Sequence, residues 1–575
     1  MIKNKFKYLN LVFLLIILFT ACNEDDFLNE TNPNSITTDT FWKNEGQYQS
    51  ALTTVYSALQ FQSVSGGELQ YEMILGDIAG TETWYRPTAF RNLTFNDGIY
   101  HVTDKWDELY VGIFRANQVI QNIETADPDI FSGQSQTEIE GQARFLRAWF
   151  YWQVAHTYGG GVMHTNIIEN DDDFHKPFVS IQEITEAIIK PDLAFAREHL
   201  PQIWDDTNKG RATWGAATSL LGKVHLYGES WTEAVDMFKE VIESSVYSLT
   251  PDIMDNFTHF NELNSESIFE TIYSSELNPG VNGAAVDDNY FESGAESSTM
   301  AVAFGQLNFG AFNTLLPSYI LHEMFVYDEV DENNVINDGN LQSKRMSASI
   351  CPFNGETDFY LQPIGSAGGW AFGQSAYIKK YTNWYHLPAE DTQNRSGINF
   401  RHIRLADVYL MYAEAVLEAS GDISTAIQYI DEIRSRAGVI TLQNYIDDNG
   451  GKMPAMHKSR QIHGNWDFNT PSVESVMTHI RRVERPLELC YEGHRWKDLV
   501  RWGIVREVFD ELREDEQWRE TFAAILSLND GGVGPIFIAE RIRPDYFLAI
   551  QNYVSEQHDY FPIPTQERQI NNMIN

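Results

Sequence analysis

The segment from Glu138 to Tyr158 constrains the fold more than any other part of the chain. Its apolar residues recur at helical spacing but cover most faces of the helix; they are Phe145, Leu146, Trp149, Phe150, Trp152 and Val154. A helix that is apolar on most sides has to be surrounded by other elements. Gly159, Gly160 and Gly161 follow directly and end it. The sequence therefore predicts a deeply buried helix here.

Periodicity predicts further helices along the chain. The predicted helical segments are 44–56, 106–123, 138–158, 181–200, 212–246, 403–438 and 473–509. Pro191 should kink or break the helix in which it stands. Residues 63–104 and 278–385 are rich in Gly, Asn and aromatic residues without a clear period, so we expect irregular structure there. The tail from Asp545 to Asn575 is predicted to be extended.

Two stretches of the chain share the pattern of a helix pair. A small residue stands where the two helices would cross: Gly222 and Ala234 within residues 212–246, and Ala413 and Ala426 later in the chain. Small residues at a crossing allow close approach, as in tetratricopeptide repeats. Together with the earlier helices, these pairs indicate a scaffold of helical pairs that is interrupted by other segments.

The N-terminus has the features of a bacterial lipoprotein signal. Three lysines precede an apolar run, Leu11 to Phe19, which is too short to span a bilayer. Thr20 and Ala21 before Cys22 match a lipobox, so we expect lipidation of Cys22 and an acyl anchor. An ordinary secretory peptide followed by a chance cysteine is the alternative. Residues 23–40 are polar and suit a tether.

The charge balance excludes several classes of partner. The chain of 575 residues has 81 Asp and Glu against 41 Lys and Arg, a net charge of −40. A nucleic-acid binder needs a basic stripe, so we expect no nucleic acid.

Three cysteines are too few for a disulfide framework. Cys490 falls in an apolar helix and is predicted to be a small buried side chain, whereas Cys351 suggests no function.

No motif indicates catalysis or a cofactor. The chain has no phosphate loop, dinucleotide fingerprint or nucleophile elbow. The histidines lack metal-ligand spacing, and the run Asp171 to Asp173 is more typical of a solvated loop than of a calcium site. Acids and arginines from Arg481 to Glu492 recur at helical spacing and predict salt bridges. Arg404 and Asp407 are expected to form a pair on a helix face. No two carboxylates stand out as those of a glycosidase.

Five segments, taken in order, carry a resemblance to a known family. They are 144–151 with Tyr158-Gly159-Gly160, then 403–415, 430–438, 484–503 and 560–564. The fourth is the most specific, with Glu484-Arg-Pro-Leu-Glu-Leu followed by Glu492-Gly-His-Arg-Trp-Lys-Asp-Leu-Val-Arg-Trp-Gly503. With the lipoprotein start, the mature chain resembles the SusD/RagB family, the surface glycan-binding lipoproteins of Bacteroidetes. The acidic run from Asn23 to Asp26 is similar to the surface-export signal of such lipoproteins.

The resemblance implies a mostly α-helical fold, in which four tetratricopeptide-like helix pairs pack against a loop-rich irregular subdomain. It implies a signal peptide over 1–21, a tether over 22–40 and a single SusD-like domain over 41–575. Within that domain the helical-pair scaffold would occupy 41–250 and 400–440, and the irregular ligand-side region 278–385. The C-terminal region of the family would cover 270–575.

The resemblance also implies a function. Members of the family bind polysaccharide or oligosaccharide without catalysis and cap a SusC-like TonB-dependent transporter, which imports the glycan. We therefore expect a lipid-anchored protein on the outer face of the outer membrane, with a role in polysaccharide utilization and with no metal or cofactor. A peptide or another nutrient in place of the glycan is the first alternative. A surface glycosidase is the second.

Residue chemistry and segment position predict the ligand site. Aromatic rings stack on the apolar faces of sugars, and planar polar side chains bond their hydroxyls. The candidates before the 106–123 helix are Trp84, Tyr85, Arg86, Phe90, Arg91, Asn96 and Tyr100. The irregular region adds Tyr290, Phe291, Trp370 and Tyr377. The alternative is that these aromatic rings only pin their loops to the helices. Arginines suit a uronate, but the net charge favours a neutral glycan.

Overall fold

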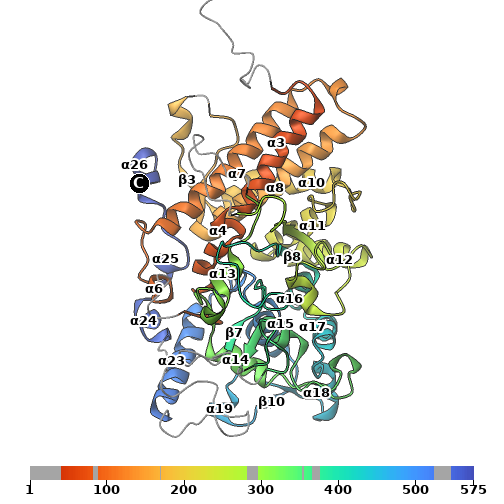
Figure 1. Cartoon of the computed structure of the whole chain (residues 1–575), viewed down its shortest axis with the longest axis vertical. Helices are drawn as coiled ribbons and strands as arrows, with labels where there is room; N and C mark the ends of the chain where they lie inside the picture. Colours follow the sequence, from red (N-terminus) through yellow and green to blue (C-terminus); the bar gives the residue numbers. More distant parts are fainter. Residues whose placement is uncertain are drawn as a thin grey trace, which may run out of the picture.

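The structure is a computed structural model that describes residues 41–81, 88–168, 170–280, 295–352, 355–364, 376–522 and 545–574. The predicted signal peptide, the lipidation site Cys22 and the tether lie outside the described residues. The described chain is mostly helical, as expected from periodicity and from the resemblance (Figure 1). None of its described helices is both long and apolar enough to cross a membrane.

Three long helices form the first part of the scaffold. α3 (Glu45–Ser57), α7 (Tyr100–Glu124) and α8 (Ser135–Tyr158) lie side by side in the upper part of Figure 1. The six apolar residues that predicted a central helix in α8 are all buried, so that prediction is confirmed. Gly159 ends α8 in the left-handed conformation with φ 75°, which glycine adopts at little cost.

The scaffold continues as a series of helices in which each packs on the next. After α8 come α10 (Lys190–His199), α11 (Trp214–Tyr227), α12 (Trp231–Glu243), α16 (Leu405–Ser420) and α17 (Ile423–Ala437). The pair α16–α17 thus stacks on α11–α12 although a long irregular region separates them in sequence (Figure 1). At Gly222 a Cβ atom would come within 2.7 Å of the Phe238 ring, which confirms the predicted close crossing of α11 and α12.

Pro191 is accommodated without ending its helix. α9 (Ile181–Ile184) leads into a π-helical turn, η5 (Thr185–Ile189), and then into α10. A proline removes one backbone donor and its ring crowds the preceding turn. The wider π turn directly before it provides that room.

The strands are short and form two-stranded antiparallel sheets. The pairs are β1 (Ala79–Gly80) with β5 (Leu316–Pro317), β2 (Gly160–Val162) with β3 (Phe178–Ser180), β4 (Ser267–Thr271) with β8 (Phe400–Arg404), β6 (Ile350–Pro352) with β7 (Ala376–Ile378), and β9 (Met453–Pro454) with β10 (Phe468–Asn469). β8 runs directly into α16, so the β4–β8 pair attaches the irregular region to the scaffold.

The remaining elements are mostly short helices. They are α4 (Gln62–Ser65), α5 (Gln70–Met73), α6 (Thr88–Arg91), α13 (Met300–Phe304), α14 (Tyr319–Val326), α15 (Lys344–Ser349), α18 (Leu442–Asp448), α19 (Arg460–His463), α20 (Val473–His479), α21 (Arg485–Leu489), α22 (Arg495–Arg501) and α23 (Val505–Phe522). A second π turn is η10 (Ile480–Glu484). The 3-10 turns are η1 (Ala58–Gln60), η2 (Gly67–Leu69), η3 (Pro128–Ile130), η4 (Asp171–Phe174), η6 (Ile253–Phe257), η7 (Leu307–Phe309) and η8 (Val335–Asn337).

Two sequence predictions of local structure were wrong. The tail was expected to be extended, but α24 (Asp545–Asn552), α25 (Ser555–His558) and α26 (Thr565–Ile570) run up one edge of the molecule in Figure 1. The predicted helix over 473–509 is broken by a turn at Tyr491, whose φ is 63°. Helices of one or two turns are too short to show a period, and they form because packing stabilises them.

Buried ion pairs join the scaffold to the C-terminal motif. Glu484 bonds Arg345 and Arg434, while Arg485 lies 2.7 Å from both Asp407 and Asp498. The predicted salt bridges of this motif are therefore confirmed, and most of them link different elements.

The expected pair of Arg404 and Asp407 is wrong. Arg404 ends β8 and bonds Glu492 and Glu488, both at the C-terminal motif, whereas Asp407 lies on α16 and bonds Arg485. The strand-to-helix change between the two residues sends their side chains to different partners. Cys490, in the same motif, is fully buried as predicted.

Candidate functional site

Several predicted site residues lie outside the described part of the chain. They are Trp84, Tyr85, Arg86, Tyr290, Phe291 and Trp370. Their assignment to a ligand site therefore stays a prediction.

Three predicted site residues, Phe90, Arg91 and Tyr377, are buried, so the structure corrects their assignment. Phe90 is 1% exposed and its ring packs against Tyr71 and Phe95. Arg91 is 2% exposed, and its Nη1 donates to the carbonyl oxygen of Ile74 at 2.7 Å. Because a bound sugar needs an accessible surface, neither side chain can contact one. The alternative, that these side chains pin the loop to its neighbours, is correct here.

Tyr377 is also buried. It lies on β7 in a small core with Cys351, Phe359 and Tyr360. Strand pairing of β7 with β6 turns this ring inward. Tyr377 therefore stabilises the irregular region and is not part of an exposed surface.

Asn96 and Tyr100 remain at the surface. The Asn96 side chain accepts a hydrogen bond from the Gly98 backbone at 2.9 Å and is otherwise open to solvent. Tyr100 begins α7, is about half exposed and lies 3.6 Å from the His101 ring, centroid to centroid. The amide of Asn96 and the ring of Tyr100 are therefore accessible, and their assignment to the ligand site stays a prediction.

The structure has an aromatic surface that was not predicted from the sequence, and we call it the Trp384 face. It consists of His259, Phe260, Trp384, Tyr385 and His386. Phe260 is 72% exposed, and its ring centroid lies 5.5 Å from that of Tyr385. The other four side chains are partly exposed. Two segments far apart in sequence thus present five rings on one surface.

Hydrogen bonds hold the two halves of the Trp384 face together. The His259 backbone N–H donates to the Tyr385 hydroxyl at 2.9 Å, and the His259 ring Nδ1 lies 2.6 Å from the same oxygen. The turn that carries Trp384 is fixed by Glu390, which accepts from the backbone and side chain of Asn383 at 2.7 and 2.8 Å. These rings are therefore held in place before any ligand arrives.

The Trp384 face combines apolar rings with neutral polar groups. Burial and the neighbouring His259 lower the pKa of His386 to about 4, and burial also lowers the pKa of His259. Both imidazoles are thus uncharged at neutral pH. Trp384 Nε1 and His386 Nδ1 are buried and have no hydrogen-bond partner within the described chain, so the partly exposed rings themselves are what the face presents. Rings that stack, two of them uncharged imidazoles, suit the apolar faces of a sugar.

A cation also lies against this face. The Lys379 ammonium is 3.6 Å from the centroid of the Trp384 ring and donates to Thr357 at 2.9 Å. Burial lowers the pKa of this ammonium to about 8. The interaction fixes one side of the indole ring.

The described ends of two further segments lie next to the Trp384 face. Ser298 pairs with Ser396, whose hydroxyl donates to Asn383 at 3.2 Å, directly before Trp384. The Ser297 backbone bonds Gly280, so the two ends of the segment with Tyr290 meet here. Strand β7, which follows the segment with Trp370, leads to Lys379 and Trp384.

One signal in the sequence would have found this face. Trp384-Tyr385-His386 is a run of three rings, two positions before Pro388, in a region without helical period. Such a run has no regular element to bury all its rings. The contribution of Phe260 carries no comparable signal, because its partner Tyr385 is 125 positions later.

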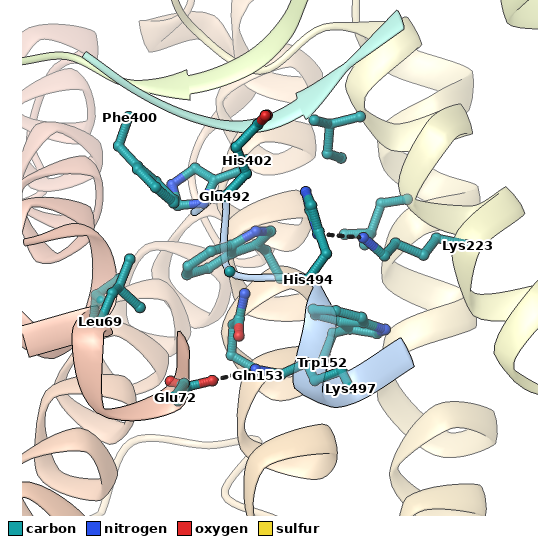
Figure 2. Close-up of a pocket in the computed structure, with 15 residues that line it drawn as sticks. Leu69, Glu72, Trp152, Gln153, Lys223, Phe400, His402, Glu492, His494 and Lys497 are labelled. Carbon is teal, nitrogen blue, oxygen red and sulfur yellow. Dashed lines mark hydrogen bonds and ion pairs between the residues drawn. The ribbon is translucent and has the colours of Figure 1, made fainter. Parts of the chain in front are cut away.

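A second concave site is small and lies inside the molecule (Figure 2). Its volume is about 40 Å³, and its lining includes Glu72, Lys223, Glu492, His494 and Lys497. Both oxygens of Glu492 are bonded by Arg404, and one also by Lys380, so this carboxylate and His494 do not form a free acid–base pair. The pocket is too small for a sugar ring.

No cluster of metal ligands occurs among the described residues, where no three His, Cys, Asp or Glu side chains are suitably grouped. The Asp171 to Asp173 run forms η4, and Asp173 Oδ2 accepts a bond from the Asn170 backbone. That carboxylate thus has a local structural role.

Comparisons with known proteins give this architecture a family. Residues 362–575 match the family described as "SusD family", and residues 26–226 match "Starch-binding associating with outer membrane". A SusD-like protein of Formosa agariphila, P25, is 25% identical over 533 residues, covering 88% of this chain and 92% of the relative. A SusD-like protein of Bacteroides ovatus is 23% identical over 527 residues, covering 88% and 84%.

Solved structures share the fold. A SusD superfamily protein of Bacteroides vulgatus superposes with a TM-score of 0.71 at 23% identity, covering 93% of this chain and 99% of that one. A structure described as a laminarin-binding SusD-like protein gives 0.65 at 22%, covering 93% and 99%. The chain belongs to the SusD/RagB family, whose members are carbohydrate-binding proteins without catalytic activity.

Proposed function

We propose that this protein binds a polysaccharide or oligosaccharide at the cell surface and delivers it to a SusC-like TonB-dependent transporter for import. The Trp384 face is the observation that carries the binding part. Five preformed rings, two of them uncharged imidazoles, match the apolar faces of a glycan. The family description "Starch-binding associating with outer membrane" and the similar structure described as laminarin-binding support the same ligand class.

The proposed site extends beyond the described rings. We include Trp84, Tyr85, Arg86, Tyr290 and Trp370, because their segments resemble the ligand-contacting segments of the family and because two of these segments begin or end beside the Trp384 face. Asn96 and Tyr100 are exposed and remain candidate ligand-binding residues outside the Trp384 face. Together these residues would present aromatic and planar polar groups to one ligand.

The proposed ligand is neutral. A net charge of −40 disfavours an acidic polymer at long range, and the two imidazoles of the Trp384 face carry no charge at neutral pH. Lys379, a cation beside the Trp384 ring, is already engaged with Trp384 and Thr357. The described part of the face thus offers stacking and hydroxyl recognition instead of ion pairing.

The proposed place of action is the exterior of the outer membrane. Lipidation of Cys22 would anchor the chain at the membrane, and the acidic run from Asn23 to Asp26, which is similar to a surface-export signal, would place the tether and the folded domain outside. The family description includes association with the outer membrane, which supports this location. Replacement of Cys22 by alanine should release the protein from membranes, and fractionation checks this.

Affinity electrophoresis tests the binding proposal. Residues 23–575 are run in gels that contain one polysaccharide each, neutral and acidic in parallel. Retardation by a neutral glycan is expected. The double variant Phe260→Ala and Trp384→Ala should bind at least tenfold more weakly, because each stacking ring contributes about 1 kcal/mol. Phe174→Ala, another exposed ring on η4, is the matched control.

Peptide recognition is the alternative for the same transporter role. If no glycan retards the protein but a peptide library does, and if Trp384→Ala abolishes that binding, the ligand class is wrong and the site is right. Co-purification with a β-barrel transporter from native membranes tests the partner independently. Its absence under mild detergent would contradict the delivery role.

A further inference from the structure

The small internal pocket of Figure 2 lies between several separate parts of the fold. α8 contributes Trp152, α11 contributes Lys223, and the segment between α21 and α22 contributes His494. Its volume of about 40 Å³ holds about three water-sized groups. Figure 2 shows the Lys223 ammonium beside the His494 ring.

Lys223 is buried without a short hydrogen bond. Its side chain is 4% exposed, and its nearest acceptors in the described chain are His494 Nδ1 at 3.3 Å and Asp407 Oδ2 at 3.4 Å. Ordinary N–H···O bonds measure about 2.7–3.2 Å. Asp407 is held at 2.7 Å by Arg485, which draws this carboxylate towards another cation. An ammonium with three donors is therefore poorly satisfied here.

Trp152 lines the same pocket. The Lys223 ammonium lies over the face of its ring, 5.2 Å from the ring centroid. The indole is 5% exposed, and its buried Nε1–H, which has no hydrogen-bond partner among the described residues, is a donor. Trp152 therefore supplies no acceptor for Lys223.

The other ionisable groups that face the pocket do not meet this need. Glu72 bonds Lys105 and Lys497, and Glu492 bonds Arg404 and Lys380. His402 shares its Nε2 with the hydroxyls of Ser65 and Thr271, and burial lowers its pKa. Burial and Lys223 lower the pKa of His494 to about 4, so the ring is neutral and supplies no compensating charge.

We propose that this pocket binds a small monovalent anion of the size of chloride, held by the Lys223 ammonium. The anion would give this ammonium a further acceptor and tie α11 to the segment with His494. This site is separate from the Trp384 face, and the proposal does not depend on glycan binding.

Bromide replaces chloride in a crystal grown or soaked in sodium bromide, and its anomalous signal locates it. We expect an anomalous peak within about 3.5 Å of Lys223 Nζ, the range of a charge-assisted contact to a large anion. Density that refines as water, without an anomalous peak, overturns the proposal. This experiment needs no variant, so it decides even if substitutions disturb folding.

Thermal unfolding tests the site in solution. At constant ionic strength, replacing sodium gluconate by sodium chloride should raise the Tm of residues 23–575 by about 1 °C for each tenfold rise above the Kd. Lys223→Met should abolish the rise. Lys239→Met, a replacement of an exposed lysine, is the control and should keep it. An equal response to gluconate and chloride overturns the proposal.

Discussion

Glu108 shows how burial changes the chemistry of a single carboxyl group. Burial raises its pKa to about 8, and its Oε2 accepts a bond from the Ser63 backbone at 2.8 Å. The unfolded carboxyl has a pKa of about 4.3, so the folded state binds the proton more tightly. The protonated Glu108 therefore contributes fully to the free energy of unfolding below pH about 4.3. That contribution is lost as the pH rises through 8.

Glu108→Gln should therefore flatten the pH dependence of unfolding between pH 5 and 8. The slope that one such group contributes is at most about 1.4 kcal/mol per pH unit, and the glutamine keeps an acceptor oxygen for Ser63. Urea unfolding at several pH values measures this slope. Glu124→Gln, on the exposed end of the same helix, should leave it unchanged. A slope that is equal in both variants would contradict the raised pKa.

Glu492 illustrates the opposite case. Burial alone would raise its pKa, but Arg404 and Lys380 outweigh that effect and lower it to about 2. Its contribution to the free energy of unfolding is present above the unfolded pKa and is lost as the pH falls towards 2.

Glu492→Gln leaves two buried cations undercompensated and should lower the free energy of unfolding by about 3–5 kcal/mol at neutral pH. Denaturant unfolding checks this against Glu186→Gln, an exposed pair with Lys190, which should change stability by less than 1 kcal/mol.

The candidate site was predictable only in its chemistry. A loop with Phe90 and Arg91 has the composition of a sugar site, yet the carbonyl groups of residues 74–79 bind the guanidinium and hold it inside. Composition cannot distinguish an arginine that bonds carbonyl oxygens from one that bonds hydroxyls. Phe260 and Tyr385 are joined only by the tertiary fold, so no local pattern reveals their contact.

At the scale of elements, the long helices were predictable and the short ones were not. α7 and α8 contain several turns with apolar residues at helical spacing, so their period is visible in the sequence. α24 has eight residues, and it forms where Tyr546 is buried against Phe509. Contacts of that kind are invisible before the chain is folded.

The crossing of α11 and α12 gives a prediction at this scale. Gly222→Ala would place a methyl group 2.7 Å from the Phe238 ring, so one helix has to move. We expect a loss of about 1–3 kcal/mol in the free energy of unfolding. Asp236→Ala, on the exposed side of α12, should change it by less than about 0.5 kcal/mol. Equal stability of the Gly222→Ala variant and the wild type would show that the crossing can relax.

At the scale of the whole molecule, charge and ligand class are linked. The chain carries a net charge of −40, yet many of its cations are buried in ion pairs with the C-terminal motif. Those cations stabilise the fold and are not available to a ligand. The surface is therefore even poorer in free positive charge than the composition suggests.

This distribution predicts how glycan binding should respond to salt. Stacking and hydroxyl recognition involve no net charge, so the affinity for a neutral polysaccharide should change less than about twofold between 50 and 500 mM sodium chloride, across which screening lengths fall below about 5 Å. Binding of an acidic polysaccharide through arginines would weaken steeply instead. Isothermal titration at the two salt concentrations measures the difference, with Phe260→Ala as the low-affinity reference. A steep loss of affinity with a single acidic glycan would contradict the proposal of a neutral ligand and show that ion pairs contribute to binding; Arg86→Ala would then test whether the predicted arginine makes them.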